Sequence, residues 1–198
     1  MVKKFVNRLD AGVGAKGWNA ILSMCNLQSL LWLFASFLIM RCMILPAANH
    51  EVQQLSGISE NIEQALVWNS GHFPVTFDLI GERARVRFIT TELTAGLLDA
   101  FLTFGFCFVL ITYVLLKMRL LNSRFKLLLF LPAIGLIADI LETAATLRVL
   151  SNDHIISNFL CFWICALYVV KWCTFLISIC TPVFGFLIGK HKAFGKMF

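Results

Sequence analysis

Four long apolar runs divide this sequence, and each is long enough to cross a lipid bilayer as a helix. The hydrocarbon core of a bilayer is ~30 Å thick, which about 20 helical residues span. The runs lie at about 27–48, 95–117, 127–147 and 155–181. We therefore expect an all-α polytopic membrane protein in which residues 1–198 form a single membrane domain, a four-transmembrane-helix bundle.

The composition excludes a soluble fold. Of the 198 residues, 59% are hydrophobic and 14% are charged, whereas soluble domains carry roughly 25% charged residues. The net charge of +6 would suit nucleic-acid binding in a soluble protein, but here the basic residues cluster at the ends of the apolar runs. We expect the lipid bilayer, and no nucleic acid, as the partner of this surface.

The basic clusters predict the topology. They precede the first run, fill the loop between the second and third runs, and form the tail: Lys3, Lys4, Arg8, Lys16, Lys117, Arg119, Arg124, Lys126, Lys190, Lys192 and Lys196. Cytoplasmic segments are enriched in Lys and Arg. We therefore expect a multi-pass protein of the plasma (bacterial inner) membrane with both termini in the cytoplasm.

A basic start followed by an apolar run also fits a signal peptide, but this run is long for one, so we interpret it as the first membrane helix. Arg41, near its far end, is expected to reach the outer headgroups. Residues 49–80 then form a long outer loop, in which apolar residues at positions 58, 62, 65 and 66 predict a short amphipathic helix.

The second helix is expected to extend beyond the membrane. The pattern from Glu82 to Lys117 is helical without a break, and such a helix is ~54 Å long, against ~30 Å of hydrocarbon. We therefore expect residues 82–94 to form an outer extension of this helix. In the fourth run, Pro182 predicts a kink or an end.

Ionisable residues inside the apolar runs are the strongest indication of a site, because each costs several kcal/mol at mid-membrane. Helical periodicity puts them on polar stripes, and such stripes face the interior of a bundle. Depth along the helices brings Lys171 and Asp139 to nearly one level, at the floor of a funnel that opens outward. The candidate residues for ligand binding or a charge network are Asp99, Asp139, Glu142, Lys171, Glu92, Thr143, Tyr168 and Arg41.

The charges of the deepest residues do not balance. Three carboxylates (Asp99, Asp139 and Glu142) and one ammonium (Lys171) cannot all remain ionised in a medium of low dielectric constant. Either a proton is shared, Arg41 or Arg148 reaches in from the rim, or a cationic ligand or metal completes the site. A salt-bridged cluster that only fixes the register of the helices explains the same residues.

Neither a metal centre, a cofactor nor a catalytic site is indicated. The four His residues lie in or beside loops or in the tail, and the seven Cys residues form no C-x-x-C pair. No nucleophile elbow or Gly-rich phosphate loop occurs. Gly185 and Gly189 form a lone G-x-x-x-G, a weak signal for a homodimer.

The stretches "GERARVRFITTELTAGLLDAFLTFGF", "LPAIGLIADILETAATL" and "LYVVKWCTFLISI" resemble an uncharacterised family of small bacterial four-helix membrane proteins. That family has Pro…Asp-x-x-Glu-Asn in helix 3 and a Lys-Trp pair in helix 4, and here Pro132, Asp139, Glu142, Lys171 and Trp172 match. The family's Asn is Thr143 in this chain. The resemblance covers roughly residues 70–180 and implies no known activity.

A more distant likeness, in architecture only, is to the sterol-isomerase and sigma-2 receptor group, which also has a long first outer loop and an acidic pocket. The intramembrane His of the isomerases is missing here, so their activity does not carry over.

These features lead us to expect an outward-opening acidic pocket that binds a small amphipathic or cationic ligand, or a lipid, without catalysis. The alternative is a structural accessory subunit, which meets a membrane-protein partner or a second copy of itself and uses the buried charges to fix helix packing. A third reading is a proton-coupled transport element with Asp139 and Glu142 as relay groups.

Overall fold

The computed structural model describes residues 23–57, 81–118, 124–151 and 158–194, and within these ranges the chain is helical and contains no strand. Of the helices in these ranges, four are long and apolar enough to cross a membrane: Leu27–Ser56, Glu82–Lys117, Leu127–Leu150 and Phe159–Pro182. The expected all-α class with four such helices is confirmed.

Helix 1 consists of α3 (Leu27–Ile39), the π-helical turn η1 (Met40–Ile44) and α4 (Leu45–Ser56). Asn26 caps its start by accepting a hydrogen bond from the Ser29 backbone N–H at 2.9 Å. At the other end Gly57 has a φ of 69°, and its N–H donates to the Gln53 carbonyl. Glycine adopts this left-handed conformation without a Cβ penalty. The helix therefore runs on past residue 48, where the sequence predicted the start of the loop.

Helix 2 consists of α7 (Glu82–Thr91), the π-helical turn η2 (Glu92–Gly96) and α8 (Leu97–Lys117). Helix 3 is α9 (Phe130–Ser151), preceded by the 3-10 turn η3 (Arg124–Leu129), and helix 4 is α10 (Asn158–Phe194). Of the two outcomes predicted at Pro182, an end of helix 4 is wrong, since α10 passes through this residue. Neighbouring groups in membrane helices satisfy the backbone that a Pro frees. The amphipathic helix predicted around 58–66 lies outside the described residues.

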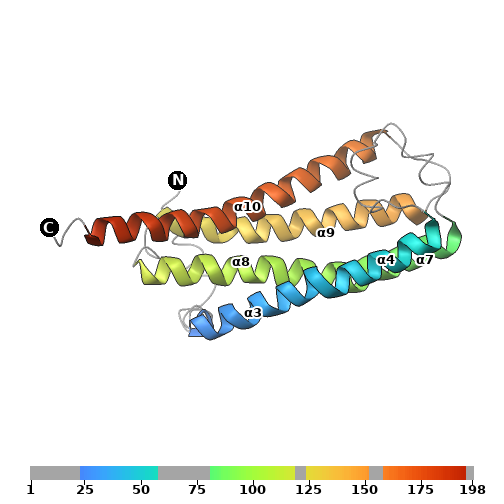
Figure 1. The fold of residues 1–198 in the computed structure, drawn as a ribbon. Coiled ribbons are helices and arrows are strands. Elements are labelled where there is room, and N and C mark those ends of the chain that lie inside the picture. Colours follow the sequence, from blue (N-terminus) through green and yellow to red (C-terminus); the bar gives the residue numbers. More distant parts are fainter. Residues whose placement is uncertain (1–22, 58–80, 119–123, 152–157, 195–198) are drawn as a thin grey trace.

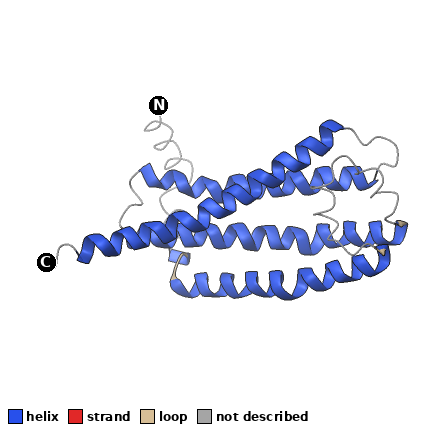
Figure 2. Cartoon of the chain, turned by 45° about the horizontal axis from the view of Figure 1, so that its top comes forward, coloured by secondary structure: helices blue, strands red, loops and turns tan. Residues whose placement is uncertain are grey.

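The helices pack side by side along most of their length (Figure 1). Helix 1 lies on helix 2, with α3 along α8 and α4 along α7, while α8 packs on α9 and α10 packs on α9 and α8. Figures 1 and 2 show that the start of α3, the end of α8 and the end of α10 lie at one end of the bundle, here called the Lys117 end. The end of α4, the start of α7 and the start of α10 lie at the other end, called the Glu82 end after the first residue of α7.

Helices 2, 3 and 4 approach one another closely at Gly135. A Cβ on this residue would overlap the Phe104 ring of α8 and lie 2.6 Å from Thr174 Oγ1 of α10. A small residue here lets the three helices come together, as is common in membrane helix packing. The contact lies one helical turn from Asp139, so it fixes the position of that carboxylate relative to α8 and α10.

Apolar packing is concentrated on the two sides of a polar level. Toward the Glu82 end a core cluster joins helices 1 to 4 and consists of Val52, Ala84, Phe88, Val149, Leu150, Cys161 and Ile164. Toward the Lys117 end a second cluster consists of Ile111, Leu115 and Leu129, with Phe108 and Leu128 packed on it. The buried charges lie between these clusters.

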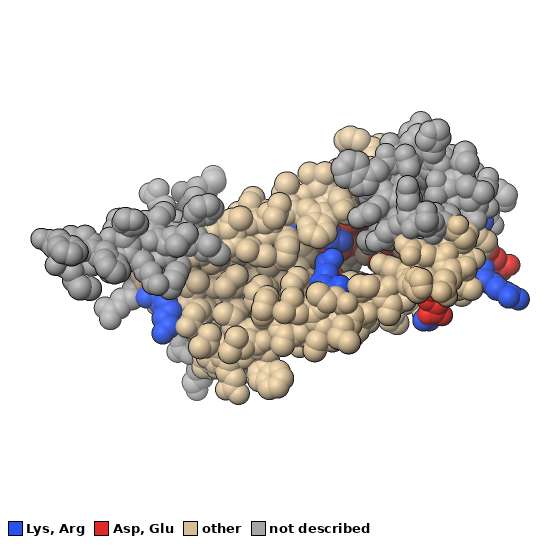
Figure 3. All heavy atoms as spheres, viewed as in Figure 1, with Lys and Arg blue, Asp and Glu red and all other residues tan. Residues whose placement is uncertain are grey.

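The outer surface of the bundle is apolar. Trp32, Phe159 and Phe162 are each more than two-thirds exposed, at 69%, 70% and 68%, which in water would be a large unfavourable patch. In the face that Figure 3 shows, charged atoms of the described residues appear near the two ends and at one hollow along the side. This distribution suits a protein whose middle is surrounded by lipid.

Candidate functional site

Two π-helical turns face the polar level from helices 1 and 2. The turn η1 carries Arg41, and Pro46 is the second residue of α4, the helix that follows this turn. Pro46 has no backbone N–H to donate to the preceding turn, and its ring crowds that turn, which accounts for the local change of hydrogen bonding. The turn η2 begins at Glu92 and ends at Gly96. Such single turns occur often at functional sites, because they change the direction of side chains within a helix.

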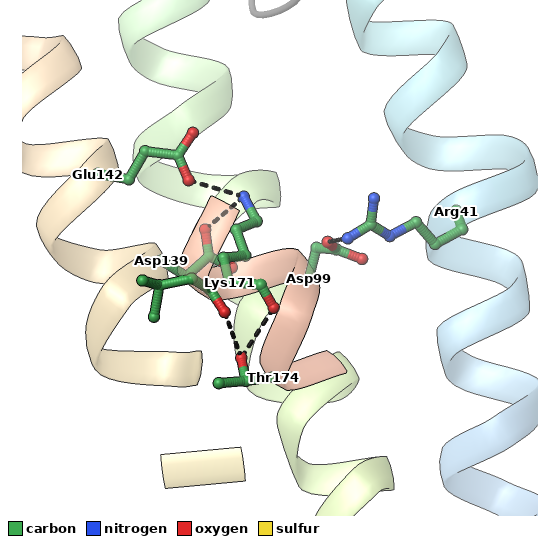
Figure 4. Close-up of polar contacts among 7 residues, drawn as sticks. Arg41, Asp99, Asp139, Glu142, Lys171 and Thr174 are labelled. Atoms are coloured by element: carbon green, nitrogen blue, oxygen red, sulfur yellow. Dashed lines mark hydrogen bonds and ion pairs between the residues drawn. The ribbon is translucent and has the colours of Figure 1, made fainter. Parts of the chain in front are cut away.

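Lys171 joins helices 3 and 4. Its ammonium Nζ lies 2.7 Å from Asp139 Oδ1 and 3.3 Å from Glu142 Oε2 (Figure 4), and the three side chains are 13%, 8% and 7% exposed. Asp139 and Glu142 are three residues apart on α9, so they lie on one face and reach the same cation. One positive charge is thus shared by two buried carboxylates.

Arg41 joins helices 1 and 2. Its Nη2 lies 2.6 Å from Asp99 Oδ2 on α8, and Figure 4 shows the two side chains extended toward each other beside the Lys171 cluster. The guanidinium carbon also lies 5.6 Å from the centre of the Trp172 ring on α10, within the range of a cation–π interaction. Arg41 is therefore directed into the bundle and not toward the headgroups; of the two directions considered for this side chain, the structure has the one that reaches in from the rim.

The Arg41–Asp99 pair uses little of its hydrogen-bonding capacity. Arg41 Nε, Asp99 Oδ1 and Trp172 Nε1 are buried and have no hydrogen-bond partner among the described residues. An unpartnered polar atom in a buried position costs about 1–3 kcal/mol. Three such atoms around one ion pair indicate a place where a ligand or water supplies the missing partners.

A cavity of about 400 Å³ connects the two groups of charges. Its polar wall contains Glu92, Asp99 and Asp139 with the two cations, and aromatic rings of α10 complete it. The lining residues are Arg41, Leu45, Pro46, Asn49, Gln53, Glu92, Gly96, Asp99, Asp139, Tyr168, Lys171 and Trp172. The volume falls within the range of ordinary small-molecule sites.

A layer of aromatic rings adjoins this cavity at Trp172. Trp172 contacts Tyr168 and Phe175, with ring centres 6.1 and 5.7 Å apart. Phe37 of helix 1 continues this layer, since its ring lies 6.3 Å from that of Phe175 and 5.9 Å from that of Phe106. The layer separates the polar level from the apolar packing below it.

The hollow is visible from the side of the bundle. In Figure 3 acidic and basic atoms border it between helix 1 and the pair formed by α9 and α10. Arg41, 31% exposed in its side chain, is the more accessible of the two lining cations. Helical phase alone gave no information about a side opening, because it only separates inward from outward faces.

The structure brings most of the predicted site residues together. Glu92 and Tyr168 line the cavity with Arg41, Asp99, Asp139 and Lys171, whereas Glu142 contacts Lys171 and is not among the lining residues. Thr143 is half-buried and lies outside the lining. The contact between Arg41 and Asp99 corresponds to one of the alternatives for balancing the charges, an Arg that reaches in from the rim.

Five polar, aromatic or turn-forming residues of the cavity were not among the predicted site residues: Pro46, Asn49, Gln53, Gly96 and Trp172. A signal for part of this set was available. Asn49 and Gln53 follow Leu45 at intervals of four residues, which would have extended the inward face of helix 1 had that helix been continued past residue 48.

Comparisons of the chain with protein-family models, with curated proteins and with solved structures found no match. The site is therefore interpreted from its own geometry. Among the described residues, no group of three His, Cys, Asp or Glu side chains is arranged to hold a metal ion. The site can bind a cation in two ways. Its carboxylates can accept hydrogen bonds from the cation, and its aromatic rings can form cation–π contacts with it.

Proposed function

We propose that this chain is a multi-pass membrane protein whose cavity binds a small amphipathic ligand with a positively charged group, without a chemical step. The observation that carries the proposal is the cavity of about 400 Å³ lined by Glu92, Asp99 and Asp139 against two cations, Arg41 and Lys171. Asp99 Oδ1 is buried and has no hydrogen-bond partner among the described residues, so it can accept a hydrogen bond from an added cation. Tyr168 and Trp172 supply aromatic faces of the kind that bind organic cations.

The side opening supports an amphipathic ligand, either a lipid or a smaller molecule with an apolar part. Leu45 and Pro46 line the cavity on helix 1, and the hollow in Figure 3 opens on the apolar flank of the bundle. A ligand that partitions into the bilayer approaches this flank directly. Its charged group then enters the polar level while its apolar part stays between the helices or in lipid.

We further propose that the Lys117 end faces the cytoplasm of a bacterial cell, so that both termini are cytoplasmic and the Glu82 end faces outward. The distribution of Lys and Arg along the sequence supports this orientation. Gln53 and Glu92 then lie on the outer side of the cavity, and Lys171 and Asp139 lie deeper in the membrane.

Binding of an organic cation to the purified protein tests the function. The probe is 4-phenylbutylammonium, and 4-phenylbutan-1-ol serves as the uncharged ligand of the same shape; both are titrated by calorimetry into protein in lipid nanodiscs. We expect the wild type to prefer the cation. Asp139→Asn should weaken cation binding about tenfold or more, because it removes an acceptor and leaves the Lys171 charge less neutralised.

Glu82→Gln is the matched control, since Glu82 is an exposed carboxylate at the start of α7. It should leave cation binding unchanged. Equal affinity of the wild type for the amine and the alcohol would refute the proposal. A measurement of thermal unfolding on each variant separates loss of binding from loss of structure.

A structural accessory role is the second candidate, and the ion pairs favour it specifically. The Arg41–Asp99 pair joins helix 1 to helix 2, and the Lys171 cluster joins helix 3 to helix 4. Suppose that neither the wild type nor Asp139→Asn binds the cation, and that Asp139→Asn is the less stable of the two. The buried charges are then better explained by a role in helix packing.

A further inference from the structure

Arg41 occupies the contacts that a cationic ligand would need. Its guanidinium lies against the Asp99 carboxylate at 2.6 Å and over the Trp172 ring at 5.6 Å. A carboxylate and an aromatic face are the two groups that recognise an organic cation in proteins. Both belong to the lining of the cavity, as does Arg41 itself.

The Arg41 guanidinium is held less firmly than the Lys171 ammonium. Lys171 contacts two carboxylates, and its side chain is 13% exposed. Arg41 has one ion-pair contact, and its side chain is 31% exposed. Its Nε and Asp99 Oδ1 both remain without a hydrogen-bond partner among the described residues. A guanidinium with one ion-pair contact at a partly exposed position is easier to exchange for another cation than an ammonium between two buried carboxylates, provided that the incoming cation neutralises Asp99.

The position of Arg41 in the chain also suits a side chain that moves. It lies in η1, the π-helical turn before Pro46, on the one helix that packs mainly against helix 2. Rotation about the long Arg side chain would carry the charge toward the open side of the hollow while the backbone of helix 1 stays in place. Asp99, by contrast, is 5% exposed and fixed on α8.

We propose that Arg41 is a built-in occupant of the cation position, and that a cationic ligand binds by displacing its guanidinium from Asp99 and Trp172. This inference rests on the proposed ligand-binding function. Displacement makes Arg41 a residue that determines specificity. Only a positively charged ligand can replace the contacts of the guanidinium with both Asp99 and Trp172. A neutral molecule of the same shape would leave Asp99 buried without a cation.

The test is whether removal of the Arg41 guanidinium raises the affinity for the cation, whereas removal of an ordinary binding residue lowers it. Removal of a competing side chain raises affinity, whereas removal of a contact lowers it. Arg41→Gln should therefore strengthen binding of 4-phenylbutylammonium on the order of tenfold relative to the wild type. Binding of 4-phenylbutan-1-ol should not change.

Two further variants separate displacement from a general gain of negative charge. Arg87→Gln also removes a guanidinium, but that group pairs with Glu51 outside the cavity, so it should leave the affinity at the wild-type value. In the Arg41→Gln background, Trp172→Leu should reverse most of the gain, because the incoming cation then lacks the ring that Arg41 had occupied. A long-range charge effect alone would survive this second change.

The outcomes distinguish the two proposals. If neither the wild type nor Arg41→Gln prefers the amine to the alcohol, the binding function itself fails. If the wild type prefers the amine but Arg41→Gln binds it equally or more weakly, the binding function stands and displacement of Arg41 is refuted. A gain in Arg41→Gln that persists with Trp172→Leu also refutes displacement from the ring.

Discussion

Lys171 of helix 4 forms ion pairs with two carboxylates of helix 3. Its ammonium is the cation in contact with Asp139 and Glu142 in the described structure, and all three side chains are largely buried. Lys171→Met would leave two carboxylates near one another without that cation. We expect the free energy of unfolding in mixed micelles to fall by about 3 kcal/mol, because the loss of one partner from a buried ion pair leaves an uncompensated charge.

Two further variants check this prediction. Lys117→Met at the exposed end of α8 should change stability by no more than about 0.5 kcal/mol. The triple variant Lys171→Met, Asp139→Asn, Glu142→Gln removes every charge of the cluster and should recover much of the loss. A triple variant as unstable as the single one would mean that shape, not charge, determines the packing here.

At the scale of elements, the crossing of helices 2, 3 and 4 depends on the absence of a side chain at Gly135. An added methyl group would overlap the Phe104 ring and press on Thr174 Oγ1. Gly135→Ala should therefore lower the free energy of unfolding by about 1–3 kcal/mol, through displacement of α8 and α10 from α9. Thermal or denaturant unfolding in detergent measures the change.

Gly105 is the matched control for this substitution. It lies on α8, and a Cβ there meets nothing within 4 Å. Gly105→Ala should leave stability unchanged or raise it by about 0.5–1 kcal/mol, because Ala loses less backbone entropy in a helix. Equal effects of the two substitutions would show that helix propensity, and not the close approach at Gly135, controls the outcome.

The elements were predictable from the sequence to different degrees. Apolar length alone identified the four candidate spans, since nothing but lipid tolerates so many exposed apolar side chains. Depth along the helices brought Asp139 and Lys171 to nearly one level. It did not reveal that Arg41 points inward, because an Arg near the end of an apolar run is equally compatible with the headgroups, and the π-helical turn that directs it is a tertiary feature.

The ends of the helices were the least predictable part. The polar sequence of α4 was interpreted as loop, although the chain remains helical to Gly57. Val52 explains the difference: it is 1% exposed and packs in the core cluster with Ala84 and Phe88 of α7. Packing on a neighbouring helix maintains a helix whose own sequence has little apolar character, and only the assembled bundle contains that neighbour.

At the scale of the whole molecule, the two ends of the bundle differ in the sequence segments they bring together. Most Lys and Arg residues belong to the segments before α3, between α8 and α9, and at the end of α10. The Glu82 end has fewer, among them Arg83, Arg85 and Arg87, which are accompanied by Glu51 and Glu82. This asymmetry predicts that the Lys117 end stays in the cytoplasm when the chain inserts.

Reporter fusions in a bacterial host test this orientation. Green fluorescent protein fused after residue 198 should fluoresce, and alkaline phosphatase at the same position should be inactive, because it folds only outside the cytoplasm. Alkaline phosphatase inserted after residue 57, directly beyond α4, should be active. The reverse pattern would turn the proposed outer side of the cavity toward the cytoplasm. It would leave the cation-binding proposal intact, because the Arg41–Asp99 pair and the side opening between helix 1 and α10 do not depend on which end faces out.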